Sequence, residues 1–277
     1  MSESTSAAVP PIIPIEGRHV LHLFYKVEYG QWSLLTADEQ LQAKTNLAAL
    51  VQEIRATPDT QLLTLSMVSP KADLGFMLMT PDLQVANAFE KRLSQSLGPD
   101  VLTPVYSFFS MTELSEYVTT EEEYTQTLEK EQGLKPGTPE FETAMGEFRA
   151  RMAKYNRDKL YPNLADWPVL CFYPMTKRRN PGQNWYTLPF EERKALMNSH
   201  GRVGRQWHGK IRQLITGATG LDDAEWGVTL FAHNTYHIKG IIYEMRFDKA
   251  SAEYAEFGDF YIGLQLPLDE LFRRLQL

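Results

Sequence analysis

The stretch HVLHLFYKVEY, residues 19–29, alternates apolar and polar side chains in the pattern of a half-buried β-strand. Residues 37–54 then place apolar side chains at helical spacing, and two further strands are expected on either side of the turn Pro-Lys-Ala-Asp at 70–73. A second helix and a closing strand follow. The predicted elements are a strand over 19–29, a helix over 37–54, strands over 61–69 and 74–80, a helix over 82–97 and a strand over 102–112. This order, βαββαβ, is that of a ferredoxin-like unit.

The same order of elements starts again in the second half of the chain. The predicted elements there are a strand over 168–175, a helix over 189–215, strands over 226–232 and 241–247, a short helix over 250–257, a strand over 259–266 and a terminal helix from Asp269. The predicted fold class is therefore α+β, with two ferredoxin-like βαββαβ units forming a dimeric α+β barrel within one chain.

The segment between the two units is acidic and has few strand signals. We interpret it as a helical connector with a helical run over about 139–158. The expected domains are a mobile N-terminal tail over 1–16, rich in Ser, Ala and Pro, an N-terminal ferredoxin-like domain over 17–113, the connector over 114–167 and a C-terminal ferredoxin-like domain over 168–277.

Composition narrows the class of protein. With 277 residues, 43% of them hydrophobic, the chain can fill a sizeable core. The net charge of −7 disfavours nucleic-acid partners, and no apolar run reaches the length of a transmembrane helix. The single cysteine, Cys171, and the absence of a secretory signal pattern predict a cytoplasmic protein.

The six histidines do not have the spacing of a zinc site, but a haem iron requires only one axial imidazole. His200 is the best candidate because Gly201 and Gly204 follow it inside a predicted helix, where glycine is unfavourable unless something approaches the backbone. From this segment alone, a histidine flanked by Met197 and Val203 is more often a core-edge residue than a ligand. His208 is a competing ligand in a more polar stretch.

Tyr173 and Lys177 lie four residues apart at the end of a predicted strand. A phenol beside an oxidised iron porphyrin can give up an electron and a proton, and a nearby cation can hold a carboxylate or help to move the proton. Trp185 can pack on a porphyrin. A core tyrosine is the alternative role of Tyr173, and a buried structural role is the commoner one for a tryptophan such as Trp185.

Arg246 and Ser251 lie where a predicted strand runs into a predicted helix, and a guanidinium and a hydroxyl there suit a carboxylate ligand. A surface Arg-Asp pair with serine as a helix cap is the alternative. The acidic group at 222–225 follows two glycines and is expected to be a solvated loop.

Five blocks of the second half together resemble the coproheme decarboxylase branch of the chlorite dismutase-like family. The blocks are FYPMTK at 172–177, NWY at 184–186, HGRVGR at 200–205, GLDDAEWGVTLF at 220–231 and EMRFD at 244–248. The resemblance is clear over about 160–263, and the first half matches in architecture.

The resemblance implies a role for each candidate residue. His200 would be the proximal iron ligand, Tyr173 the radical-forming tyrosine and Lys177 the residue that assists it beside the reactive propionate. Trp185, Arg246 and Ser251 would line or anchor the porphyrin in the C-terminal, haem-binding domain.

Two further positions bear on the choice of branch. Gln213 stands thirteen residues after the proximal histidine, where true chlorite dismutases carry a distal arginine, and a neutral amide cannot supply that charge. On the expected helix, the nearby Lys210 and Arg212 would point to other faces. Lys159 replaces an arginine that contacts a propionate in many members, so it keeps the charge but loses the bidentate geometry.

The family implies that Fe-coproporphyrin III (coproheme) is both substrate and redox centre. Hydrogen peroxide would oxidise propionates 2 and 4, whose carboxyl groups leave as carbon dioxide while the remaining carbons become vinyl groups, and haem b would be the product. A homopentamer and a transient ferrochelatase contact are also implied. A protein that binds, delivers or senses haem without turnover, and a chlorite dismutase, are the alternative functions.

Overall fold

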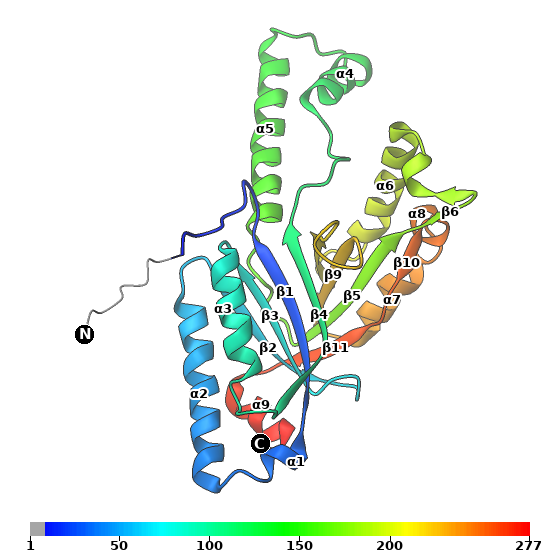
Figure 1. Cartoon of the computed structure of the whole chain (residues 1–277). Coiled ribbons are helices and arrows are strands. Elements are labelled where there is room, and N and C mark those ends of the chain that lie inside the picture. Colours follow the sequence, from blue (N-terminus) through cyan, green and yellow to red (C-terminus); the bar gives the residue numbers. More distant parts are fainter. Residues whose placement is uncertain (1–8) are drawn as a thin grey trace.

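The first half of the chain in the computed structural model is a four-stranded antiparallel sheet covered on one face by helices (Figure 1). Its sheet order is β4-β1-β3-β2. The elements are β1 (His19–Val27), α1 (Tyr29–Trp32), α2 (Ala37–Ala56), β2 (Gln61–Met67), β3 (Leu74–Thr80), α3 (Leu83–Ser94) and β4 (Leu102–Thr112). A capping box between Thr36 and Glu39 fixes the start of α2.

The second half repeats this arrangement. The equivalent strands have the order β11-β5-β9-β8, so in both halves the fourth strand lies beside the first, then the third and the second. The main elements are β5 (Val169–Lys177), α6 (Phe190–Arg205), β8 (Ile211–Gly217), β9 (Trp226–Ala232), α7 (Thr235–Met245) and β11 (Tyr261–Gln265). The smaller ones are β6 (Arg179–Asn180), β7 (Gln183–Asn184), the 3₁₀ turn η1 (Trp185–Thr187), α8 (Lys249–Ala252) and β10 (Ala255–Phe257).

The two sheets join into a closed barrel. β2 pairs with β11 at one junction, β4 pairs with β8 at the other, and β5 pairs with both β9 and β11. The predicted fold class, two ferredoxin-like units forming one α+β barrel, is confirmed. Aromatic and aliphatic side chains fill the barrel interior, among them Phe24, Phe108 and Phe172. His22 is fully buried there, and its Nε2 lies 2.8 Å from the Thr229 hydroxyl.

Three assignments in the second half were wrong. Residues 211–217 are strand β8 and not the end of a long helix, because α6 ends at Arg205 and Gly209 adopts a positive φ of 78°. Residues 241–247 were expected to be a strand but fall mostly in helix α7, which Asn234 caps. Residues 250–257 divide into α8 and the short strand β10. The βαββαβ order was still correct, because β8 was missed and a strand over 241–247 was wrongly added; the short strands β6, β7 and β10 were not predicted.

The connector forms a helical projection that stands off the barrel (Figure 1). It consists of α4 (Glu121–Glu131) and α5 (Pro139–Leu160), packed around Leu128, Phe141 and Met145. Lys194 of α6 forms an ion pair with Glu123 of α4, so the projection is tied to the second half of the barrel.

The structure describes residues 9–277. The expected mobile tail over 1–16 therefore lies partly outside the described residues. Within the described part, Ile12 accepts a backbone hydrogen bond from Leu83 and donates one to Asp82, which anchors this segment at the start of α3. The C-terminal helix α9 (Leu268–Leu275) packs with α2 and α3 against the first half. No helix within 9–277 is long and apolar enough to span a membrane.

Candidate functional site

Helix α6 covers the second sheet but does not close on it. Only Lys194 of its sixteen residues is buried, whereas the equivalent α2 buries five apolar side chains. Leu196, Met197 and Val203 stay partly exposed. An amphipathic helix that leaves its apolar side chains half-exposed stabilises the fold poorly, which is expected where a ligand completes the packing.

His200 lies on α6 and is held by a buried carboxylate. Its Nδ1 lies 2.9 Å from Oδ2 of Asp248 and 3.4 Å from the hydroxyl of Ser251. The Asp248 side chain is only 2% exposed, and the His200 side chain is 31% exposed. With Nδ1 engaged by a carboxylate, Nε2 is left with its lone pair, which is the arrangement of an imidazole that ligates a metal.

Asp248 is positioned by the chain immediately after α7. It caps the short helix α8, and its Oδ2 accepts the backbone N–H of Ser251 at 3.3 Å. Ser251 lies in the first turn of α8 and is also buried. The structure therefore places the predicted porphyrin-binding Ser251 beside His200, on the same ring nitrogen as Asp248.

Tyr173 lies on β5 and points toward the α6 and α7 layer, within the cluster that also contains Trp207 and Met245. Its ring centroid lies 4.7 Å from that of Phe260 and 5.5 Å from that of Phe257. Burial raises the pKa of the Tyr173 phenol above its usual value, so the hydroxyl keeps its proton at neutral pH. Burial therefore disfavours loss of the proton by ionisation alone.

Lys177 lies on the same face of β5 and is buried without a carboxylate partner within 4 Å among the described residues. Its Nζ donates a 3.2 Å hydrogen bond to the Ala250 carbonyl and lies 4.1 Å from the centroid of the Trp185 ring. Burial lowers the pKa of the Lys177 ammonium to about 8, against the opposing influence of Asp248 and Glu225. This cation is poised to exchange a proton near physiological pH.

The acidic group at 222–225 was expected to be a solvated loop, and for two of its members this was wrong. Glu225 is buried and accepts the backbone N–H of Lys177 at 2.7 Å. Asp222 accepts the backbone N–H of Phe109 at 2.8 Å. These carboxylates are used to fix the end of β5 and the junction with β4, because buried main-chain donors need acceptors.

Arg246 does not lie on a strand, as was expected, but at the C-terminal cap of α7. Its guanidinium carbon lies 4.4 Å from the Phe257 ring centroid, and its charge acts on the nearby Tyr173 phenol. Arg246 and Tyr173 thus both contact Phe257. The planar guanidinium remains available to a carboxylate because, within 9–277, it forms no ion pair.

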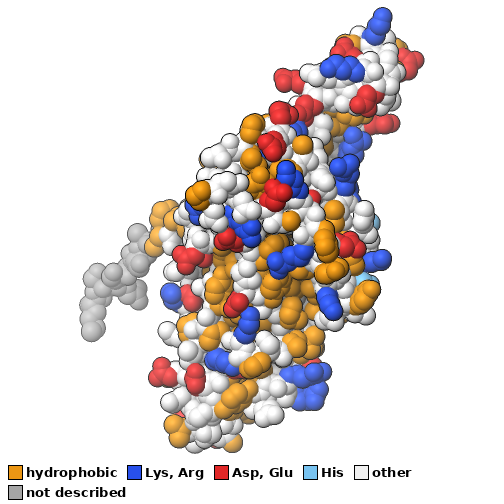
Figure 2. All heavy atoms as spheres, turned by 90° about the vertical axis from the view of Figure 1, so that its right-hand side faces the viewer, with side chains coloured by type: hydrophobic (Ala, Val, Ile, Leu, Met, Phe, Trp, Pro, Cys, Tyr) orange, Lys and Arg blue, Asp and Glu red, His pale blue; other side chains and the backbone are white. Residues whose placement is uncertain are grey.

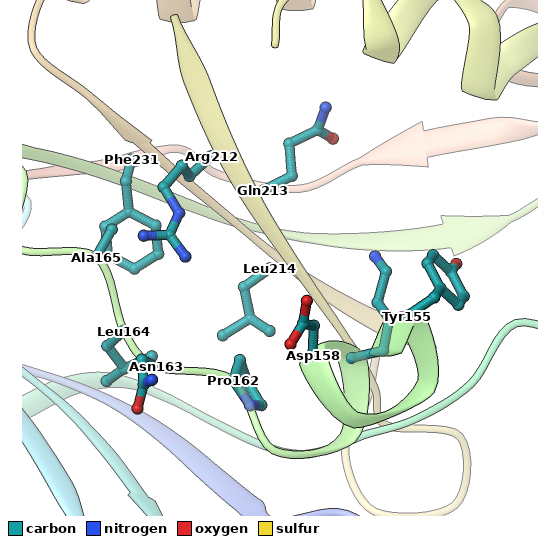
Figure 3. A pocket seen from close by; sticks show the side chains of 11 residues that line it. Tyr155, Asp158, Pro162, Asn163, Leu164, Ala165, Arg212, Gln213, Leu214 and Phe231 are labelled. Carbon is teal, nitrogen blue, oxygen red and sulfur yellow. The ribbon is translucent and has the colours of Figure 1, made fainter. Parts of the chain in front are cut away.

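Gln213 and Lys159 meet at a cavity of about 160 Å³ between the end of α5 and strands β8 and β9 (Figure 3). Gln213 lies on β8, not on a helix, and its amide Nε2 lies 3.3 Å from the position that a Cβ would take at Gly204 of α6. Adjacent strand residues face opposite sides of a sheet, and Figure 3 shows Arg212 and Gln213 pointing apart. Burial lowers the pKa of the Lys159 ammonium.

The predicted site residues fall into one layer and its rim. Seven of them lie between the second sheet and the helices that cover it: Tyr173, Lys177, Trp185, His200, Gln213, Arg246 and Ser251. Lys159 lies at the rim. Sequence reasoning missed Asp248 as the partner of His200 and Glu225 as the anchor of Lys177, since both contacts join residues 48 positions apart.

Within the described residues, no three His, Cys, Asp or Glu side chains gather in a way that could hold a bare metal ion. The donor set fits a metal that arrives inside a macrocycle. His200 would supply a nitrogen ligand to its iron, and Lys177 and Arg246 would offer cations to its acidic substituents.

Known proteins resemble this chain in sequence and in fold. The family model described as chlorite dismutase matches residues 40–266. A solved structure described as a novel heme-binding protein from Thermus thermophilus has 36% sequence identity and a TM-score of 0.78, and the match covers 98% of this chain and 100% of that one. A chlorite dismutase from Candidatus Nitrospira defluvii in complex with imidazole has 15% identity and a TM-score of 0.70, with 95% and 97% covered. A mutant of that enzyme has 17% identity and a TM-score of 0.71, with 95% and 98% covered.

Proposed function

The chain belongs to the chlorite dismutase family, and we propose that within it the protein is a coproheme decarboxylase. The substrate is Fe-coproporphyrin III and the product is haem b. For each of propionates 2 and 4, one hydrogen peroxide accepts two electrons and becomes two waters. The propionate loses its carboxyl group as carbon dioxide and one hydrogen from the neighbouring carbon, which leaves a vinyl group.

The observation that carries this proposal is the convergence of three groups on one layer of the second half. An imidazole with its Nδ1 held by Asp248, a buried phenol and a buried ammonium lie between the sheet and helices α6 to α8. The heme-binding description of the Thermus protein, at 36% identity, supports haem-type chemistry for the same layer.

His200 would hold the substrate iron through Nε2. Its partner Asp248 keeps the ring in one orientation and makes the imidazole a stronger donor. When bound, the iron porphyrin supplies the redox chemistry with peroxide. The chain's own residues orient its acidic side chains and move protons.

Tyr173 would be the hydrogen-abstracting group and Lys177 the residue that assists it. The phenol gives up an electron and a proton together, which its burial favours over ionisation. Lys177 can hold the reacting carboxylate and deliver or accept a proton near pH 8. Trp185, Ser251 and Arg246 would line the porphyrin or bind its other acid groups, and Lys159 would do so from the rim.

Gln213 supports this branch over chlorite dismutation. Its neutral amide lies against the Gly204 backbone of α6 and supplies no cation to an oxyanion. A chlorite dismutase would be expected to need such a charge at that place.

The proposal is tested by mixing the apo-protein with ferric coproheme and then with peroxide. Mass spectrometry of the porphyrin should record the loss of two carboxyl groups. Tyr173→Phe should bind coproheme with an unchanged absorption spectrum but release no carbon dioxide. Tyr261→Phe, a buried tyrosine on the barrel interior, is the matched control and should keep full activity.

Two results would favour the other candidate functions. Tight binding of haem, together with no decarboxylation of coproheme by either the wild-type protein or the control, would indicate a non-catalytic haem-binding, delivery or sensing protein. Oxygen release from chlorite would indicate a chlorite dismutase. Unimpaired product formation by Tyr173→Phe would remove the tyrosyl radical from the mechanism.

The proposal extends to assembly and context. We expect a homopentamer, to be checked by light scattering, with the porphyrin in the C-terminal domain over 168–277 of each subunit. Hydrogen peroxide as oxidant, a transient ferrochelatase contact and a cytoplasmic location are parts of the same proposal.

A further inference from the structure

A strongly basic stretch borders the candidate site in an otherwise acidic protein. Residues 193–221 contain six Lys or Arg residues and no Asp or Glu, while the chain as a whole has a net charge of −7. Two of the six, Arg193 and Lys194, pair with Glu116 and Glu123 of the connector. The other four are exposed and, within residues 9–277, form no ion pair: Arg202, Arg205, Lys210 and Arg212. We call these four residues the basic rim.

Two members of the basic rim lie near His200. Arg202 and Arg205 follow it on α6, so the rise of an α-helix places them about 3 and 8 Å further along the axis. The Arg205 Nη1 lies 3.3 Å from the position that a Cβ would take at Gly201. Arg212 lines the cavity that Gln213 and Lys159 share, together with Asp158, and its side chain points away from that of Gln213 (Figure 3). The separations of Arg202 and Arg205 from His200 along α6 are within the Debye length of about 10 Å at 0.1 M salt, so these two charges act at the site, and Lys210 and Arg212 continue the positive charge along the chain.

The carboxylates near the C-terminal end of α6 are hydrogen-bonded to groups outside the basic rim. Asp248 binds the His200 ring, and Glu244 accepts a 2.7 Å hydrogen bond from the Trp207 indole nitrogen. Neither forms an ion pair with a member of the basic rim. Figure 2 shows Lys and Arg side chains around an apolar area on the face that lies to the right in Figure 1.

We propose that the basic rim is a receiving surface for polycarboxylate porphyrins, which accelerates the binding of a porphyrin with four carboxylates more than that of one with two. This inference rests on the proposed function. A positive field attracts an incoming anion in proportion to its charge, and such steering raises association rates by about 10- to 1,000-fold.

The selectivity has a direction that suits turnover. Each decarboxylation removes one carboxylate, so the substrate is drawn to the site more strongly than the product. The overall charge of −7 would otherwise repel an acidic porphyrin, and a local positive surface is needed to overcome it.

The test measures association rate constants by stopped flow for ferric coproheme and for haem b binding to the full-length apo-protein. With the wild-type chain, the rate for coproheme should fall steeply as salt is raised, and the rate for haem b should fall less. Arg202→Glu combined with Lys210→Glu should slow coproheme about tenfold at low salt and haem b by a smaller factor. High salt should remove the difference.

The matched control is Lys44→Glu combined with Lys135→Glu, which changes the net charge equally on α2 and at the tip of the connector, and it should change neither rate by more than about twofold. An equal slowing by the control pair, or a coproheme rate independent of salt, would overturn the receiving surface while leaving the proposed function intact. The salt dependence of the wild-type chain decides this even if the variants do not fold. Failure of coproheme to bind the wild-type chain at all would overturn the proposed function itself.

Discussion

Helices α2 and α6 occupy equivalent positions in the two halves of the barrel, but α2 packs tightly on its sheet and α6 does not. α2 buries Leu47, Leu50, Val51 and Ile54 against its sheet, together with Ala43. α6 buries only Lys194 and presents His200 toward the layer where its counterpart has leucines. The two copies of the fold therefore differ in how tightly the covering helix packs on its sheet.

The buried polar groups follow the same division. The helix-covered face of the first half is a cluster of aliphatic and aromatic side chains. In the second half, Lys177, Asp248, Ser251 and Glu225 are all buried. Burying charge costs stability unless each group is paired, so packing alone does not account for these residues, and they coincide with the candidate site.

The largest expected effects come from replacing one residue in each helix, His200 in α6 and Leu47 in α2. His200→Ala should abolish axial coordination of coproheme, seen as loss of the histidine-ligated absorption spectrum, while changing the unfolding free energy little. Leu47→Ala in α2 should lower the unfolding free energy by about 2–5 kcal/mol through the cavity it creates, with coproheme binding unchanged. Denaturant titration and spectral titration of both variants separate the two roles. Loss of coproheme binding in Leu47→Ala, or a large loss of stability in His200→Ala, would contradict the comparison.

A second contrast uses the N-caps of the two halves. Asp248→Asn should weaken coproheme affinity by about 10- to 100-fold, because the amide orients His200 less firmly than the carboxylate does. Thr36→Ala removes the cap of α2 and should leave affinity unchanged. Equal affinities for all three proteins would mean that Asp248 acts only as a helix cap.

The buried ammonium of Lys177 should destabilise the apo-protein. Lys177→Met is expected to raise the unfolding free energy by about 2–3 kcal/mol below pH 8, since the pKa of the buried ammonium is lowered from 10.5 to about 8. Between these two values the unfolded chain binds more protons, so wild-type stability rises with pH across this window and the advantage of methionine shrinks. Denaturant titrations at pH 7 and pH 10 measure this. The variant should also lose decarboxylase activity, and an unchanged stability at both pH values would contradict the assignment.

The smallest expected effect is on the cap of α2. Thr36→Ala should lower the unfolding free energy by about 1 kcal/mol, because the backbone N–H of Glu39 loses its acceptor. Thermal unfolding provides the measurement, with Thr45→Ala on the exposed face of the same helix as the control. A loss as large as that of Leu47→Ala would show that capping, and not packing, dominates the stability of the first half.

Much of the fold could be predicted from periodicity. The strands at 74–80, 102–112 and 226–232 have the predicted bounds, since period-two patterns and turn residues mark both ends of each. A strand was wrongly predicted over 241–247 because Ile241, Ile242 and Tyr243 favour strands. The helical spacing of Ile238, Ile241 and Met245, which are buried in α7, indicates a helix instead.

The site could be predicted only in part. His200, Tyr173 and Lys177 were identified from residue type and from the resemblance of their motifs, and they do lie in one layer of the second half. Their partners could not be found in this way. The contact between His200 and Asp248 depends on how α6 packs beside α8, and the contact between Lys177 and Glu225 depends on how β5 and β9 align.

The most direct test of the account is a crystal structure of the complex with ferric coproheme. We predict that Nε2 of His200 is bound to the iron, with Nδ1 still on Asp248, and that the Tyr173 hydroxyl lies beside a propionate. Iron bound by His208 or by any other residue, or a porphyrin seated against the first half of the barrel, would contradict it.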